Sequence, residues 1–136
     1  MELIYQAEVQ VTGGRDGLAQ STDGLLNLAI QKPKELNGLG IQPNPEQLFA
    51  AAWGASLLST IKMFAASSNI DTEKATVTVR TSLNRNASGY LLAADIEVHI
   101  PGLSVEETAE IVEEAYLFCP YYKAIRGNID VKILAV

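Results

Sequence analysis

The stretch NPEQLFAAAWGASLLSTIKMFAAS, residues 44–67, decides the fold of this 136-residue chain. Asn44 can cap a helix, Pro45 suits the first helical position, and Glu46 complements the positive end of the helix dipole. No charged residue occurs from Leu48 to Ile61. A helix that is apolar on all sides is surrounded by protein. Because one chain of this length can hardly enclose so long a helix, the pattern indicates a second copy of the chain.

Alternating apolar and polar residues predict strands on both sides of this helix. The expected strands are Glu2–Val11, Leu25–Ile30, Ala75–Leu83, Leu92–Ile100 and Gly127–Val136. The loop of the hairpin between the third and fourth strands is expected at Asn84–Gly89, and Lys32–Pro43 is expected to be loop with one helical turn at most.

A second helix is predicted to begin at Ser104, where Glu107 completes a capping box. It should run to about Phe118 and stop at Cys119-Pro120, because a residue before proline is disfavoured in helical geometry. This order of elements predicts an α+β fold with antiparallel sheets around a buried central helix: strands, a long helix, a hairpin, a second helix and a final strand. No linker or repeat interrupts it, so we expect one domain over residues 1–136.

Composition excludes several classes of function. The net charge is −6 and the ten Lys and Arg residues are scattered, which argues against a nucleic-acid partner. One cysteine excludes an intrachain disulfide, and one histidine excludes most zinc sites, so neither a bound metal nor a bound cofactor is expected. The sequence shows neither a membrane-spanning run nor the plan of a signal peptide, and we expect a cytoplasmic protein.

Four residues could carry chemistry, and each also has a simpler interpretation. Arg15 lies in a glycine-rich turn, where a charged residue usually faces solvent. Glu46 can simply complement the helix dipole. Ser56 can be a small residue at a tight helix crossing. Cys119 can be a small buried hydrophobe. The residues by themselves leave both interpretations open.

A resemblance to a known family favours the chemical interpretation. Four segments, in order and at compatible spacing, resemble the signature stretches of the organic hydroperoxide resistance (Ohr) proteins of the Ohr/OsmC family: TGGRDG at 12–17, PKEL at 33–36, NPEQLFAA at 44–51, and CPY at 119–121 followed by RGNIDV at 126–131. A single match of this kind is weak, whereas four in register are specific.

The resemblance implies a fold, an activity and partners. Ohr proteins are intertwined homodimers that reduce organic hydroperoxides, including lipid-derived ones, in defence against oxidative stress. A reactive cysteine in the central helix attacks the peroxide, and a second cysteine then closes a disulfide. An external dithiol of the lipoyl type, dihydrolipoamide or a lipoylated protein, reduces that disulfide. By this resemblance Arg15 and Glu46 match the pair that activates the thiolate, and Cys119 matches the resolving cysteine.

The reactive cysteine of the family falls on Ser56 in this chain. A serine hydroxyl cannot be oxidised by a peroxide as a thiol is to a sulfenic acid. No histidine stands close in sequence to act as its general base. Little or no peroxidase turnover is therefore expected. Three explanations remain open: an engineered Cys-to-Ser change, a natural homologue that binds a hydrophobic small molecule in the same interface pocket, and a one-cysteine peroxidase that uses Cys119.

Helix geometry gives a second indication of a dimer. Glu46 and Ser56 are ten positions apart, which is about 15 Å along a helix axis. The Arg15–Glu46 pair would therefore have to reach position 56 from another chain. If the site is built as in the family, Ser56 Oγ and the Cys119 sulfur should lie close together. Tyr122 and Lys123 stand where relatives often have small or polar residues, so the surroundings of Cys119 can differ.

Overall fold

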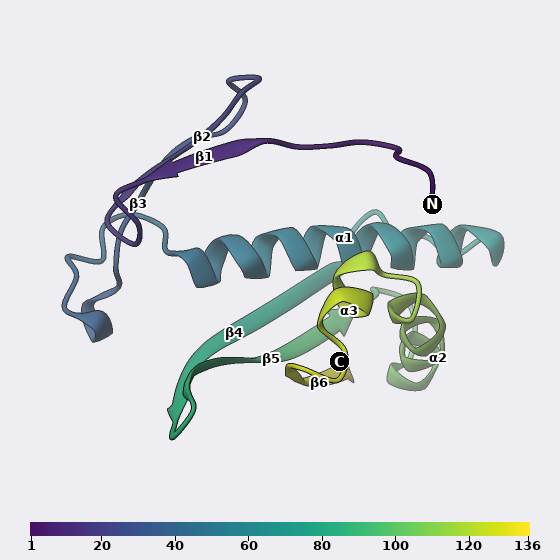
Figure 1. Cartoon of the computed structure of the whole chain (residues 1–136). Coiled ribbons are helices and arrows are strands. Elements are labelled where there is room, and N and C mark those ends of the chain that lie inside the picture. The colour runs from purple at the N-terminus through teal and green to yellow at the C-terminus, as the bar shows by residue number, and fades with distance from the viewer. The chain divides into compact units, whose positions relative to one another are not determined.

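A 23-residue helix, α1 (Pro45–Ser67), is the longest element of the computed structural model, which describes all residues 1–136 (Figure 1). Asn44 caps it as predicted: Asn44 Oδ1 accepts from the Gln47 amide at 2.9 Å, and Gln47 Oε1 accepts from the Asn44 amide at 3.0 Å. This reciprocal arrangement satisfies two backbone groups that a helix start leaves unpaired. The helix therefore begins where the sequence indicates and extends to the predicted end.

The chain divides into two compact units, residues 1–48 and 49–136, and each is described by itself. The first contains an antiparallel sheet of β1 (Val9–Thr12), β2 (Gly17–Ser21) and β3 (Asn27–Ile30). A single 3-10 turn, η1 (Lys34–Leu36), follows in the segment predicted to be loop. The expectation of one domain remains a prediction.

Two predictions for the first unit need correction. The strand expected at Glu2–Val11 is a strand only from Val9, which pairs with Ser21, the last residue of β2. One further contact, from the Thr22 amide to the Glu8 carbonyl, precedes it, and no strand pairs with the residues before Glu8. Strand β2 was not expected, since GLAQS lacks the β-branched and aromatic residues typical of strands. Pairing with neighbours on both sides makes it a strand nonetheless.

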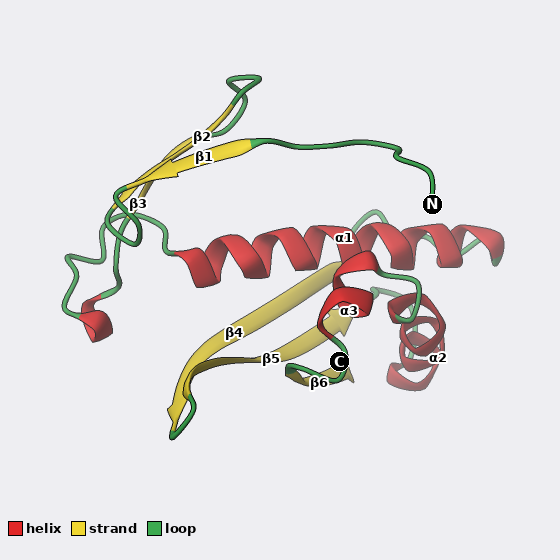
Figure 2. Ribbon diagram, viewed as in Figure 1, coloured by secondary structure: helices red, strands yellow, loops and turns green.

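The second unit contains the sheet β4 (Thr76–Asn86), β5 (Gly89–His99) and β6 (Asp130–Ala135), together with α2 (Val105–Tyr116) and α3 (Pro120–Ile125) (Figure 2). The α+β class and the central helix are as predicted. The hairpin loop is tighter than expected, because pairing continues to Asn86 and Gly89. Strand β6 pairs with β5 in parallel, which departs from the antiparallel prediction.

Helix α2 has the predicted capping box: Ser104 Oγ accepts from the Glu107 amide, and Glu107 Oε2 accepts from the Ser104 amide. It ends at Tyr116, slightly before the predicted end. The short helix α3 was missed, because Pro120 was interpreted only as a stop signal. Proline also suits the first position of a helix, and there it begins α3.

One face of α1 forms the centre of the hydrophobic core. Its fully buried residues are spaced four apart, at Trp53, Leu57, Ile61 and Ala65, and they pack with residues of β5, α2 and α3. By length and composition alone, α1 could also cross a membrane. The buried stripe instead identifies it as the core helix of a globular fold.

The opposite face of α1 is exposed, so the expectation of a helix enclosed on all sides is not met within one chain. This uncharged face, here called the small-residue face, also repeats every four residues and consists of Ala51, Ala55, Ser59 and Met63. The side chain of Met63 is 62% exposed.

Replacing Ser104 with alanine should lower the free energy of unfolding by about 1 kcal/mol, because the cap of α2 is lost. Urea denaturation at a fixed protein concentration measures this loss. Ser104→Asp keeps a capping side chain, and its free energy of unfolding should be close to that of the native chain. An alanine variant as stable as the native chain would show that the cap contributes nothing.

Candidate active site

Arg15 lies at the tip of a turn whose shape depends on glycine. Gly13 and Gly14 have φ values of 74° and 63°, in the left-handed region that favours glycine. A Cβ on Gly17 would collide with the carbonyl oxygen of Thr12. The turn is also held from the side, since Asp16 accepts from the Lys32 backbone amide at 3.1 Å and pairs with the Lys32 ammonium group at 3.0 Å. These contacts fix the backbone position from which the Arg15 side chain extends.

Arg15 and Glu46 form a bidentate ion pair within the first unit. Arg15 Nη2 donates to Glu46 Oε1 at 2.7 Å, and Nη1 donates to Oε2 at 2.9 Å. The Glu46 side chain is 14% exposed and that of Arg15 is 40% exposed. The hydrogen bonds from Arg15 lower the pKa of Glu46, against an opposing effect of burial. Because two parallel bonds fix both groups, the guanidinium has a defined direction as well as a charge.

Ser56 and Cys119 form the second pair of predicted site residues, within the second unit. Ser56 Oγ lies 3.7 Å from Cys119 Sγ, so the expected proximity is confirmed. Ser56 is half-buried on α1, whereas Cys119 is fully buried. Because Cys119 is the only cysteine, its thiol faces a hydroxyl rather than a second sulfur.

Pro120 decides the position of Cys119. The Cys119 backbone is extended, with φ −62° and ψ 122°, as expected for a residue that precedes proline. Its amide donates to the Tyr116 carbonyl at 3.2 Å, and its carbonyl accepts from the Lys123 amide at 3.0 Å. Cys119 is therefore the cap of α3, at the junction of two helices, and its side chain belongs to the hydrophobic core.

Apolar and aromatic side chains flank this junction. Phe118 is 57% exposed and Tyr121 is 37% exposed. The Phe64 ring of α1 lies 5.1 Å from the Phe118 ring, centroid to centroid. The surroundings of the Ser56–Cys119 pair are thus largely apolar.

The four predicted residues therefore form two pairs, each within one unit. Sequence reasoning missed the Asp16–Lys32 contact that holds the Arg15 turn, and it missed a pair of tyrosines on either side of Cys119. The signal for the tyrosines was present, because Tyr116 and Tyr122 are symmetrically spaced about Cys119. No group of three or more His, Cys, Asp or Glu side chains could hold a metal ion.

Comparison with known proteins assigns the family. The OsmC-like protein family model matches residues 38–134. The organic hydroperoxide resistance protein-like 2 of Staphylococcus epidermidis is 37% identical over 133 residues, which cover 96% of this chain and 94% of that protein. The chain therefore belongs to the OsmC-like family, among its organic hydroperoxide resistance proteins.

Solved structures agree with this assignment. An organic hydroperoxide resistance protein OsmC of Legionella pneumophila superposes with a TM-score of 0.92 at 39% identity, covering 98% of each chain. The organic hydroperoxide resistance protein OhrB of Bacillus subtilis superposes with a TM-score of 0.87 at 34% identity, covering 98% of this chain and all of that one. The predicted family and fold are thus confirmed.

Glu46→Gln should destabilise the fold at neutral pH by at most about 1 kcal/mol, the upper range for partly exposed ion pairs. Because folding lowers the pKa of Glu46, the pair stabilises the fold above the ordinary value of 4.5. That contribution is lost as the pH falls through the lower value of the folded protein. The stability difference between native and variant chains should therefore disappear in acid.

Urea titrations of both chains from neutral pH to below pH 4.5 measure this difference. Glu114→Gln, on the exposed surface of α2, is a matched control for the loss of one carboxylate. A difference that persists unchanged in acid would show that the charge of Glu46 does not stabilise the fold.

Proposed function

We propose that this chain has the scaffold of a thiol peroxidase that reduces organic hydroperoxides, with serine in place of the reactive cysteine. The observation that carries the proposal is the 3.7 Å separation between Ser56 Oγ and Cys119 Sγ. A sulfur atom at position 56 would face the Cys119 thiol from the distance at which two cysteines could close a disulfide after a small approach. The relatives are named organic hydroperoxide resistance proteins, which supports hydroperoxides as the substrate class.

The chemistry of a cysteine at position 56 follows in balanced steps. The thiolate attacks one peroxide oxygen, the O–O bond breaks, and the alkoxide leaves as an alcohol after taking a proton. The cysteine is then a sulfenic acid. The Cys119 thiol displaces its hydroxyl as water, and a disulfide forms. An external dithiol, for which we propose the lipoyl type, reduces the disulfide and is itself oxidised.

The Arg15–Glu46 pair would favour the first step. A free cysteine is mostly protonated near neutral pH, and a nearby guanidinium stabilises its thiolate. Glu46 orients that guanidinium through two hydrogen bonds. Arginine suits this task because it stays charged at every pH of interest and its planar donors bond a carboxylate through two parallel hydrogen bonds.

Ser56 leaves this arrangement without a nucleophile. A hydroxyl is not ionised near neutral pH, and the only histidine, His99, is bonded through Nδ1 to the Val136 carbonyl at the exposed end of β5. Cys119 is fully buried and has no second cysteine in its chain. We therefore propose that the chain as it stands turns over little or no hydroperoxide.

The Ser56–Cys119 pair differs by a single atom, oxygen in place of sulfur at position 56, from a pair of cysteines. The Ser56 hydroxyl and the Cys119 thiol are near neighbours in a largely apolar setting. A sulfur in place of the Ser56 oxygen would add an ionisable, oxidisable group beside a second sulfur. The fold around the pair would need no rearrangement, since the substitution changes one half-buried atom by a small volume.

We further propose that the working unit is a homodimer in the cytoplasm. Glu46 and Ser56 lie on the same helix about 15 Å apart along its axis, so the pair would serve position 56 of a second copy. The small-residue face of α1 supports this assembly. Small, uncharged side chains let two helices approach closely, and no other part of the second unit covers them.

Ser56→Cys should restore hydroperoxide reduction. With cumene hydroperoxide and dihydrolipoamide, its first step should be at least about tenfold faster near neutral pH than that of an ordinary thiol, because an adjacent guanidinium raises the thiolate fraction. Ser68→Cys is the matched control, since it places an exposed cysteine just beyond the end of the same helix and outside the small-residue face. Stopped-flow measurement of peroxide consumption gives both rates.

Two other results would decide against the proposal. Equal rates for the cysteines at positions 56 and 68 would show that the site no longer activates a thiol. Saturable binding of a hydrophobic fluorophore by the native chain, together with an inactive Ser56→Cys variant, would favour a homologue that binds a hydrophobic small molecule.

Ala55→Glu should weaken the homodimer at least about tenfold, because it buries an unpaired charge at the small-residue face. Sedimentation velocity over a concentration series measures the dissociation constant. Ala124→Glu, exposed on α3, is the control and should sediment as the native chain does. A native chain that remains monomeric at all concentrations would contradict the proposed assembly.

A further inference from the structure

Cys119 is the midpoint of a short segment that joins α2 to α3. Tyr116 is the last residue of α2 and Tyr122 lies within α3, each three residues from Cys119. The Cys119 amide is bonded to the Tyr116 carbonyl, and the Tyr122 carbonyl accepts from the Arg126 amide at 2.9 Å. On each side of the thiol, the backbone is therefore held by a hydrogen-bonded turn: one contains Tyr116 and the other contains Tyr122.

The two tyrosine rings connect the ends of this segment directly. Their centroids are 4.5 Å apart and their planes make an angle of 75°, which is an edge-to-face contact. Such ring pairs contribute beyond the area that they bury. A hydrogen bond to Tyr122, together with burial, raises the pKa of Tyr116. Ring packing and the phenol contact therefore hold α3 against the end of α2.

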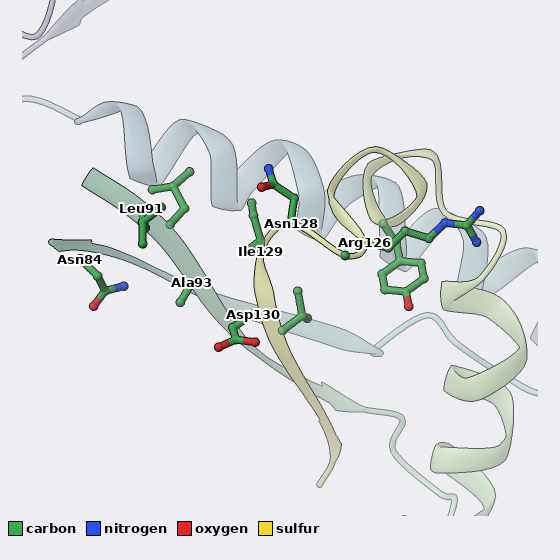
Figure 3. Close-up of a pocket in the computed structure, with 11 residues that line it drawn as sticks. Asn84, Leu91, Ala93, Arg126, Asn128, Ile129 and Asp130 are labelled. Atoms are coloured by element: carbon green, nitrogen blue, oxygen red, sulfur yellow. The ribbon is translucent and has the colours of Figure 1, made fainter. Parts of the chain in front are cut away.

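Tyr122 also stands between two hollows in the surface of the second unit. One, of about 770 Å³, lies between the β4–β5 hairpin and residues 126–131 (Figure 3). The other, of about 290 Å³, lies between α2 and β6. Tyr122 and Val131 line both hollows. In Figure 3 the Arg126 side chain extends away from Asn84 and Asp130, so it does not close the larger hollow.

Beside these hollows, α3 is held by the tyrosine contact, by the buried Ile125 and by the Lys123 ammonium over the Phe118 ring. Removal of the Tyr122 ring would join the two spaces and remove the ring contact that joins α3 to the last residue of α2. The segment 116–122 could then shift toward the enlarged space and carry Cys119 with it. The consequence would fall on the thiol, because the separation of Cys119 Sγ from position 56 depends on where this segment lies.

We propose that Tyr122 is a positioning residue for the Cys119 thiol, and that its ring, packed on Tyr116, keeps Cys119 Sγ opposite position 56. The inference rests on the proposed function, in which this thiol forms a disulfide with a cysteine at position 56. A disulfide tolerates only a narrow range of geometry, so two sulfurs held face to face form it far more readily than sulfurs on a mobile segment.

The test uses the full-length Ser56→Cys chain and the reduction potential of the disulfide between its new thiol and Cys119. The protein is equilibrated with reduced and oxidised dithiothreitol. Two protein thiols transfer two electrons and two protons to the cyclic reagent, which becomes a dithiol. Tyr122→Ser should lower the equilibrium constant for the disulfide at least about tenfold, which corresponds to about 30 mV for two electrons.

Three variants separate positioning from general damage. Tyr122→Phe keeps the ring and should preserve the potential. Tyr90→Ser removes a tyrosine that is 67% exposed at the hairpin end and should also preserve it. Tyr122→Leu fills part of the space but provides no aromatic ring. It should shift the reduction potential of the disulfide in the same direction as Tyr122→Ser does. It serves as the test if the serine variant does not fold.

The otherwise native chain provides a second measurement, because Cys119 is its only cysteine. Tyr122→Ser should accelerate alkylation of the buried thiol, whereas Tyr122→Phe should not. The proposal is overturned if the serine and leucine variants keep the reduction potential of the parent Ser56→Cys chain. It is also overturned if Tyr122→Phe shifts that potential as far as Tyr122→Ser does, or if the parent chain forms no disulfide. Because the exchange needs no peroxide, an inactive Ser56→Cys enzyme would refute the proposed function without affecting this comparison.

Discussion

The buried stripe of α1 is the constraint on which the second unit depends. Trp53, Leu57 and Ile61 are completely buried, and each contributes roughly 1.5–3 kcal/mol through removal of apolar surface from water. Their spacing fixes the rotation of the helix about its own axis. Ser56 immediately precedes Leu57 and is therefore held at the border of the core, where Cys119 packs against the same cluster.

The Arg15–Glu46 pair is a second constraint, set by electrostatics and by backbone conformation together. The glycine turn positions the arginine, the Asn44 cap positions the glutamate, and two hydrogen bonds join them. In the first unit this pair links the β1–β2 turn to the start of α1. This structural role does not depend on which residue stands at position 56.

The sequence by itself determined the features that depend on local chemistry. The cap at Asn44, the capping box at Ser104, the length of α1 and the four candidate residues could all be inferred from neighbouring residues. Motif spacing also predicted the family. These signals are local because helix ends, turns and short motifs are decided by residues within a few positions of one another.

Only the tertiary structure decided the features that depend on distant partners. Strand β2 exists because two neighbouring strands pair with it, and β1 begins only at Val9 because its ladder with β2 ends at the Val9–Ser21 pair. The parallel pairing of β6 with β5 follows from packing between segments far apart in sequence, and so does the 3.7 Å value of the Ser56–Cys119 separation, of which the family resemblance predicted only the proximity. Long-range contacts leave no periodic signal in a single sequence, which is why these features could not be inferred from it.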